Sequence, residues 1–145
     1  MRVLIQRVTH ASVTIDGKVK SKIENGLLVF VGIEDRDKDE DIEWLAGKVV
    51  NIRIFNDEND VMNKSVLDIN GEILVVSQFT LYADCRKGNR PSFTEAASPA
   101  KAEELYEYFK TKCAEKIANV QSGIFGAHMK VSLLNNGPVT IILEK

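Results

Sequence analysis

The chain has 145 residues, which suits one domain built around one hydrophobic core. Its 44% hydrophobic and 28% charged residues are typical of a folded globular protein and exclude a disordered or fibrous one. The formal charge of −2 argues against a surface that coats nucleic acid through many phosphate contacts, but it leaves room for a small basic patch.

Apolar runs and cysteines indicate where the protein works. The longest apolar run, residues 27–31, is far too short to span a bilayer, so we expect no membrane partner. The segment 1–7 carries charge where a signal peptide would have its apolar core, and no signal peptide is expected. The two cysteines, Cys85 and Cys113, are too few for a disulfide scaffold. These features favour a cytoplasmic protein.

The first third of the chain is predicted to form strands. Residues 2–15 are rich in β-branched side chains and end at Asp16-Gly17, a hairpin turn signal, so residues 19–24 are the expected partner strand. Asn25-Gly26 is a second turn signal. Residues 27–33, which follow it, are apolar on both faces, and this pattern indicates a strand that is covered on both sides.

A helix is predicted after an acidic stretch. The residues that recur at helical spacing are Ile42, Leu45, Ala46, Val49 and Val50. Asp37 or Asp39 is the expected N-cap, because a short carboxylate accepts hydrogen bonds from the first free backbone N–H groups. Residues 56–60 are expected to form a loop.

The second half of the chain predicts a buried strand over 72–78, a helix that begins at Ser98-Pro99, and two final strands over 127–134 and 139–143. The apolar stripe expected on this helix consists of Ala102, Leu105, Tyr106, Phe109, Cys113 and Ile117. Two helices against about eight strands predict a single α+β domain over residues 1–145. We expect two packed, barrel-like β-sheets with both main helices on one outer face.

The residue inventory excludes several ordinary catalytic arrangements. Only two histidines occur; we place His128 on the polar face of a strand, and no histidine is placed beside a nucleophile. Cys113 fits the apolar helical stripe, and nothing beyond a neighbouring arginine marks Cys85 as reactive. No His or Cys pair has the spacing of a metal site, and no Gly-rich phosphate loop is present, so neither metal nor cofactor is expected.

Two segments combine polar and apolar residues in an unusual way. In SQFTLY at 77–82, an apolar strand runs into alternating polar and large apolar side chains, which is typical either of a solvent-facing strand end or of hydrogen-bond donors at the mouth of a pocket. In NNGPVT at 135–140, Asn-Gly would ordinarily signal a hairpin, yet the following proline removes a donor and fixes φ. Each segment alone also fits a purely structural role.

Together the two segments resemble the SQFTLY and NxGPxT motifs of D-aminoacyl-tRNA deacylases, the D-tyrosyl-tRNA deacylase family. The similarity extends to MRVLIQRV at the start of the chain, KGNRPSF at 87–93 and FGAHMKV at 125–131. Neither main motif departs from the family pattern. Two six-residue motifs in this order, in a chain of this length, make the match specific.

The resemblance implies an activity and an assembly. The family hydrolyses the ester between a D-amino acid and the terminal adenosine of tRNA, and it also processes glycine mischarged on tRNA-Ala. It implies a homodimer in which Gly137-Pro138 of one subunit, joined by a cis peptide bond, enters the site of the other and rejects L-amino acids. The expected partners are therefore the 3′ end of an aminoacyl-tRNA and a second copy of the chain. No organic cofactor is implied.

The resemblance also implies roles for individual residues. Ser77, Gln78, Phe79 and Thr80 are the expected catalytic residues, with the Gln78 amide and the backbone N–H groups near Phe79 and Thr80 stabilising the oxyanion. The 2′-hydroxyl of the terminal adenosine is expected to assist the attacking water, since the protein offers no base. The expected supporting residues for the Gly-Pro segment are Arg7, Asn135 and Thr140.

Two alternatives remain open from the residues. Arg86, Lys87 and Arg90 form a small basic cluster that is expected to contact tRNA, and with Phe93 they also suit a catalytically silent module that binds RNA ends. An esterase with Thr80 as covalent nucleophile is the other alternative, although a threonine without a nearby base is a weak nucleophile.

Overall fold

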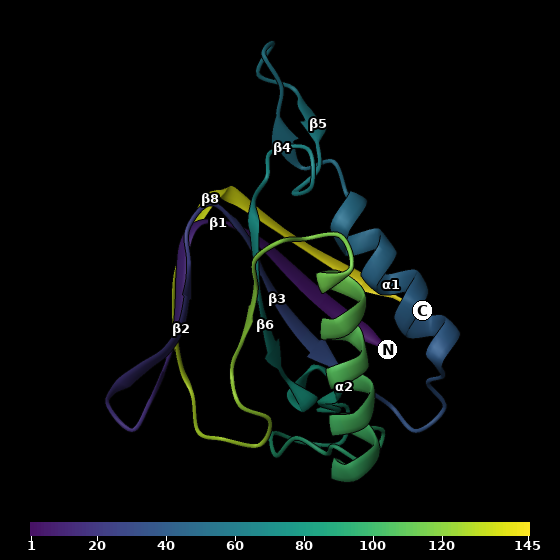
Figure 1. The fold of residues 1–145 in the computed structure, drawn as a ribbon. Coiled ribbons are helices and arrows are strands. Elements are labelled where there is room, and N and C mark those ends of the chain that lie inside the picture. The colour runs from purple at the N-terminus through teal and green to yellow at the C-terminus, as the bar shows by residue number, and fades with distance from the viewer.

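A computed structural model describes residues 1–145 and has an α+β fold with two α-helices on one side of a curled sheet (Figure 1). The elements are β1 (Arg2–Ile15), β2 (Lys18–Ile23), β3 (Gly26–Gly32), α1 (Asp39–Asn51), β4 (Phe55–Asn56), β5 (Met62–Lys64), β6 (Glu72–Ser77), a 3₁₀ turn η1 (Phe79–Tyr82), α2 (Pro99–Ala114), β7 (Val120–Ser122) and β8 (Lys130–Glu144). No helix is long and apolar enough to cross a membrane.

The main sheet has six strands, five of them in the order β2-β1-β3-β6-β7. Along β1, β3 pairs with residues 2–8 and β2 with residues 11–15, and the sixth strand, β8, pairs with both stretches of β1. Asp16 and Gly17 both have positive φ values, 49° and 76°, as the predicted hairpin turn between β1 and β2 requires. The pairing of β1 with β8 shifts register twice between Gln6 and His10. Such irregularities bend a strand, and the long, bent β1 lets the sheet curl over itself.

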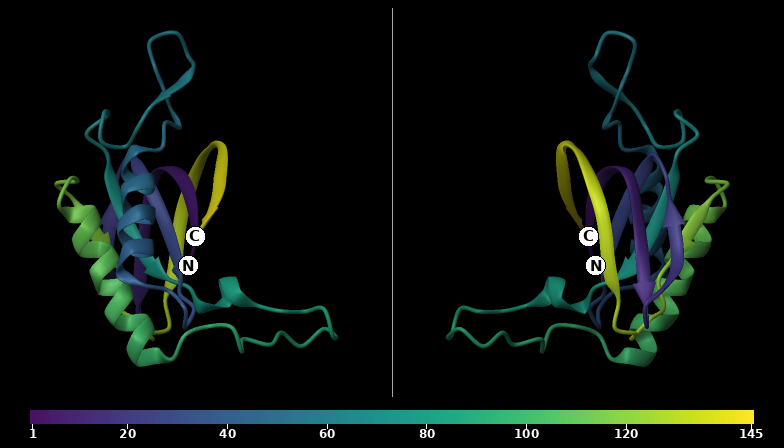
Figure 2. Two further views of the ribbon diagram at one scale, coloured as in Figure 1. Left: turned by 90° about the vertical axis from the view of Figure 1, so that its right-hand side faces the viewer. Right: turned by 90° about the vertical axis from the view of Figure 1, so that its left-hand side faces the viewer.

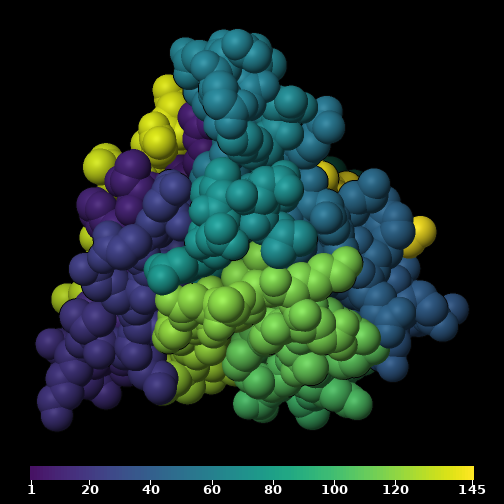
Figure 3. Space-filling model, turned by 45° about the horizontal axis from the view of Figure 1, so that its top comes forward, coloured from purple at the N-terminus to yellow at the C-terminus, as the bar shows by residue number.

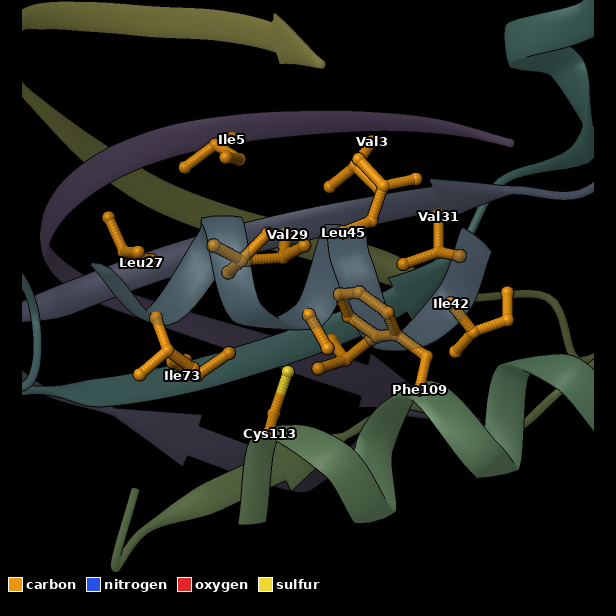
Figure 4. Close-up of a cluster of buried hydrophobic side chains, with 14 of the residues drawn as sticks. Val3, Ile5, Leu27, Val29, Val31, Ile42, Leu45, Ile73, Phe109 and Cys113 are labelled. Atoms are coloured by element: carbon orange, nitrogen blue, oxygen red, sulfur yellow. The ribbon is translucent and has the colours of Figure 1, made fainter. Parts of the chain in front are cut away.

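Both faces of β3 and β6 are buried, as the continuous apolar runs predict. Leu27, Val29 and Val31 face the helices together with Ile73 and Val75, in a cluster of 22 buried residues (Figure 4). The alternate residues of the same strands, such as Leu28 and Leu74, enter a second cluster of seven buried residues inside the curled sheet. The predicted α+β class with a barrel-like sheet is therefore confirmed, and strand alternation explains how one sheet holds two apolar layers.

The two helices cover one outer face, as predicted (Figures 1 and 2). The predicted apolar stripe is buried on α2 at Leu105, Tyr106, Phe109 and Cys113, and Ala102 packs against the same cluster. Ile117 is also buried in this cluster but lies beyond the end of α2 at Ala114, so its predicted place on the helix is wrong. Ser98 takes the N-cap position with Pro99 in the first helical turn, so the predicted start of α2 is correct.

The predicted N-cap of α1 is wrong. Lys38 occupies that position, and the Asp41 carboxylate accepts a hydrogen bond from the Lys38 N–H at 3.1 Å. Asp37 is instead buried, where its carboxylate contacts the α-ammonium group of Met1 at 2.5 Å and the Glu34 N–H at 2.8 Å. The local pattern assigns Asp37 to the cap, but in the fold its carboxylate pairs with the distant Met1 ammonium group instead.

The end of the chain differs from the prediction in two places. The two predicted final strands are the two halves of one element, β8, which begins at Lys130 and is interrupted by a loop at residues 136–139, so residues 127–129 lie outside it. β7 was not predicted. Two segments also project from the body. Residues 83–98 extend as an arm beside the start of α2, and β4 and β5 stand out at the opposite end (Figures 1 and 2). The β4–β5 projection is the knob at the top of the space-filling view (Figure 3).

Candidate functional site

A cavity of about 570 Å³ opens at the carboxyl end of β6. Its walls come from the ends of β3 and β6, from α2 and residues 93–97 just before it, and from the segment 125–131 that leads into β8. Of its 18 lining residues 13 are hydrophobic, and none is Asp, Glu, Lys or Arg. A cavity of this size and character suits an uncharged, largely apolar group and offers little to a phosphate.

Three of the predicted catalytic residues, Ser77, Gln78 and Phe79, line this cavity. The Gln78 N–H donates to the Val31 carbonyl at 2.8 Å, and the chain then turns into η1. The first hydrogen bond of this turn joins the Leu81 N–H to the Gln78 carbonyl. The N–H groups of Phe79 and Thr80 come before it in the chain, so they have no acceptor within the turn. The strand end therefore presents an amide side chain and backbone donors at the cavity.

Aromatic rings form one wall of the cavity. Phe79 is 56% exposed, and its ring meets the ring of Phe93 edge to face, with centroids 5.0 Å apart and planes at 69°. Phe125 packs against Tyr106, whose hydroxyl donates to the Val75 carbonyl at 2.9 Å. These rings give the cavity flat apolar surfaces on which a planar ring can stack.

Thr80 does not line the cavity and is exposed. Its hydroxyl oxygen accepts a hydrogen bond from the Gln78 side-chain amide. No hydrogen bond joins Thr80 to a histidine or a carboxylate. The contact positions Gln78 and Thr80 relative to each other, but it gives Thr80 no base to remove its proton.

The second predicted segment forms a tight loop within β8. The Gly137–Pro138 peptide bond is cis, and Gly137 has a φ of 141°, a conformation that favours glycine. Asn135 and Thr140 close the loop: the Asn135 side chain accepts from the Val139 N–H at 2.8 Å and donates to the Thr140 hydroxyl at 2.9 Å. Both predicted supporting residues thus lie at the base of this loop.

Arg7 holds the same loop from below. Arg7 is only 9% exposed, and its Nε donates to the Asn136 carbonyl at 2.8 Å. One terminal nitrogen donates to the Ile54 carbonyl at 2.6 Å and to the Asn56 side chain at 3.3 Å. Arg7 therefore ties the loop to the start of the β4–β5 projection.

The two motif segments lie far apart within one chain. Arg2 on β1 donates to the Leu81 carbonyl, whereas Arg7 on the same strand donates to Asn136. Five residues of extended strand span about 16 Å. The views in Figures 1 and 2 agree, because η1 and the bend of β8 lie at opposite ends of the sheet. The exposed Gly137 and Pro138 therefore do not reach their own cavity.

The predicted tRNA-binding residues lie on the projecting arm of residues 83–98. Arg86, Lys87 and Arg90 are all exposed. Arg86 is paired with Asp84 through two contacts of 2.9 and 2.7 Å, and this hydrogen bonding lowers the pKa of Asp84 to about 2. The Asp84 charge offsets that of Arg86, so Lys87 and Arg90 are the cations without a paired carboxylate, and with Glu95 the arm has a small net positive charge.

Several cavity residues were not predicted from the sequence. The FGAHMKV segment at 125–131 resembles the family, but the sequence predicted no role for it; in the structure it lines the cavity with Phe125, Ala127 and Met129. His128, expected on the polar face of a strand, precedes β8 and is exposed at the cavity. Cys113 is fully buried as predicted, and burial raises its thiol pKa to about 12. No group of three or more His, Cys, Asp or Glu side chains is arranged to hold a metal ion.

Comparison with known proteins adds an independent observation. The family model described as D-Tyr-tRNA(Tyr) deacylase matches residues 4–144. A D-aminoacyl-tRNA deacylase of Thermosipho africanus is 58% identical over 99% of this chain and 97% of its own length, and one of Flavobacterium psychrophilum is 59% identical with the same coverage.

Two solved structures share the fold of this chain. The solved structure of a c-Myc DNA Unwinding Element Binding Protein is 41% identical to this chain and superposes with a TM-score of 0.95, over 100% of this chain and 99% of that one. A probable eukaryotic D-amino acid tRNA deacylase shares the fold at a TM-score of 0.83, with 19% identity over 98% of this chain and 97% of its own.

Proposed function

The chain belongs to the D-Tyr-tRNA(Tyr) deacylase family, a family of ester hydrolases, and we propose that it hydrolyses the ester between a D-amino acid and the terminal adenosine of tRNA. The observation that supports this substrate is the cavity at Ser77–Phe79, which has aromatic walls and no acidic or basic lining residue other than histidine. A nucleobase is planar and uncharged, and it matches such walls.

Catalysis rests on donors placed where charge develops. Attack of water on the ester carbonyl creates an oxyanion, which the Gln78 amide and the N–H groups of Phe79 and Thr80 stabilise. Each such donor contributes roughly 10²–10³ in rate. No carboxylate lines the cavity, and the one histidine there, His128, makes no hydrogen bond with Gln78 or Thr80, so we assign the assistance of the attacking water to the 2′-hydroxyl of the terminal adenosine.

The active protein is a homodimer with two shared sites. Gly137 and Pro138 are exposed, and the residues of β1 that contact the two segments, Arg2 and Arg7, are about 16 Å apart along the strand, so the segment suits insertion into a partner's cavity. Sedimentation at assay concentration tests this arrangement. An active monomer contradicts it, because a single chain does not bring the two motifs together.

Selection of D over L substrates follows from the same insertion. The two enantiomers differ at the α-carbon, so backbone carbonyls brought close to that atom read handedness without reading the side chain. Gly137, which has no side chain, permits this close approach, and the loop is held rigidly by Arg7. Glycine has no side chain to exclude, and glycine mischarged on tRNA-Ala is therefore also a substrate. We place the reaction in the cytoplasm, where aminoacyl-tRNA is used.

The two alternative functions make different demands. A Thr80 nucleophile needs a base, whereas the Thr80 hydroxyl receives a hydrogen bond from Gln78 and faces no carboxylate or histidine partner. A silent RNA-end module needs only the basic arm, where Asp84 balances one of the three cationic side chains. Trapping of an acyl-threonine would support the first, and binding without ester hydrolysis would support the second.

The decisive experiment compares D-tyrosyl-tRNA with L-tyrosyl-tRNA as substrates of the pure protein. We expect rapid release of D-tyrosine and little release of L-tyrosine above the spontaneous rate. Equal release of both enantiomers contradicts the chirality proposal while leaving esterase activity intact. Absence of release from either one contradicts the enzymatic proposal itself.

A further inference from the structure

The turn η1, which presents the proposed oxyanion donors, packs directly against the end of β3. A Cβ atom added to Gly32 would lie 3.1 Å from both the Gln78 carbonyl oxygen and the Leu81 side chain. Real contacts are rarely this close, so the absence of a side chain at Gly32 sets how deeply the turn sits. This packing supports one side of the turn and leaves its carboxyl end to be held by other groups.

Arg2 contacts that carboxyl end in two ways. One of its terminal nitrogens donates to the Leu81 carbonyl at 2.9 Å, and its guanidinium carbon lies 4.6 Å from the centre of the Tyr82 ring. A third contact, from Arg2 Nε to the Glu144 carboxylate at 2.8 Å, fixes the guanidinium on the outer side. The planar fork of arginine allows these contacts to be made together.

Tyr82 is itself fixed in the core. Its side chain is only 3% exposed, and its hydroxyl donates to the Glu34 carboxylate at 3.1 Å. The ring is therefore a rigid platform against which the Arg2 guanidinium is placed. Because the last residue of the turn is anchored and the preceding carbonyl is held by Arg2, the backbone of Phe79 and Thr80 has little freedom to shift.

We propose that Arg2 is a positioning residue for the deacylation reaction, and that it acts by holding η1 so that its backbone donors meet the oxyanion. Arg2 does not line the cavity, so it acts only through the turn. This inference rests on the proposed function, since it concerns the geometry of that same site. A shift of about 1 Å in a catalytic group is enough to lower a rate about 100-fold.

The test uses a variant of similar length that has no donor and no charge. Arg2→Met keeps an apolar stem against Tyr82 but loses both the hydrogen bond and the cation. We expect kcat for D-tyrosyl-tRNA to fall by about ten-fold to 100-fold, with KM changed less than about two-fold. Arg2→Lys, which keeps a charge and a donor, should recover much of kcat. Because Arg2 is 36% exposed, both variants are expected to fold, and circular dichroism checks this.

Glu144→Gln is the matched control. It removes the ionic partner of Arg2 and leaves both contacts with the turn, so we expect kcat to stay within about two-fold of wild type, as for other exposed ion pairs. If Arg2 only contributed to packing, Arg2→Met, Arg2→Lys and Glu144→Gln would all lower thermal stability, and none would lower kcat while leaving KM nearly unchanged.

Hydrogen exchange gives a readout that does not depend on activity. In the substrate-free protein, Arg2→Met should speed amide exchange in the 77–82 peptide, while peptides of α1 remain unchanged. Wild-type kcat together with unchanged exchange in Arg2→Met overturns the inference. If wild-type protein itself releases no amino acid, the proposed function fails, and the exchange result alone then decides whether Arg2 holds the turn.

Discussion

Replacing Arg7 by lysine tests how the loop at 135–138 is held. The buried guanidinium of Arg7 serves three acceptors at once: the Asn136 and Ile54 carbonyls and the Asn56 side chain. Nε donates to the Asn136 carbonyl, and one terminal nitrogen donates to the Ile54 carbonyl and the Asn56 side chain. A lysine ammonium is a single point at the end of a flexible stem, so it cannot occupy both positions.

The expected loss follows from these contacts. Hydrogen bonds to a charged donor contribute about 1.5–3 kcal/mol each, and a buried carbonyl left without a partner costs about 1–3 kcal/mol. With either the Asn136 or the Ile54 carbonyl unpaired, Arg7→Lys should lower the free energy of unfolding by about 2–4 kcal/mol. Domains of this size are stable by about 5–15 kcal/mol, so the variant should still fold.

Urea unfolding at one fixed protein concentration measures the stability loss, because the apparent stability of the proposed dimer would depend on concentration. Hydrolysis of D-tyrosyl-tRNA measures the functional loss, expected at about 100-fold if the loop moves by about 1 Å. Gln6→Ala is the control, since Gln6 lies on the same strand and makes only an exposed contact with Thr140 at 3.2 Å. Its cost should be below about 1 kcal/mol. An Arg7→Lys protein with wild-type stability and rate refutes the reasoning.

Three further outcomes are expected. Thr80→Ala should keep substantial activity, whereas a substrate with a 2′-deoxy terminal adenosine should lose most of it; the opposite pattern in single-turnover assays returns Thr80 to the nucleophile role. Reaction with a thiol reagent at pH 8 should modify Cys85 quickly and Cys113 only after unfolding, because burial raises the pKa of Cys113 to about 12 and withholds its thiolate; two fast thiols would contradict that burial. Reversing both charges at Lys87 and Arg90 should raise KM for the aminoacyl-tRNA about ten-fold with kcat unchanged and weaken its salt dependence; an unchanged KM removes the arm from tRNA binding.

The sequence by itself determined the elements whose signals are local and long enough to read. The both-sided apolar runs at 27–33 and 72–78 become β3 and β6, and Ser98-Pro99 begins α2, because alternation, helical spacing and capping act within a few residues of each other. The two motif segments were also visible in the sequence, since their polar and proline residues interrupt otherwise apolar strands. Their family resemblance is confirmed by the full-length match.

Only the tertiary structure decided the features that depend on distant neighbours. β7 has three residues, too few for a pattern of its own, and is formed by pairing with β6. Asp37 leaves the helix cap because the Met1 ammonium group lies beside it in the fold. The cavity gathers residues from four parts of the chain, and strand register places its turn and Gly137-Pro138 at opposite ends of the sheet (Figure 1). Bringing residues that are distant in sequence together has an entropic cost, and only the packed contacts of the whole fold offset it. A local sequence pattern therefore does not predict these contacts.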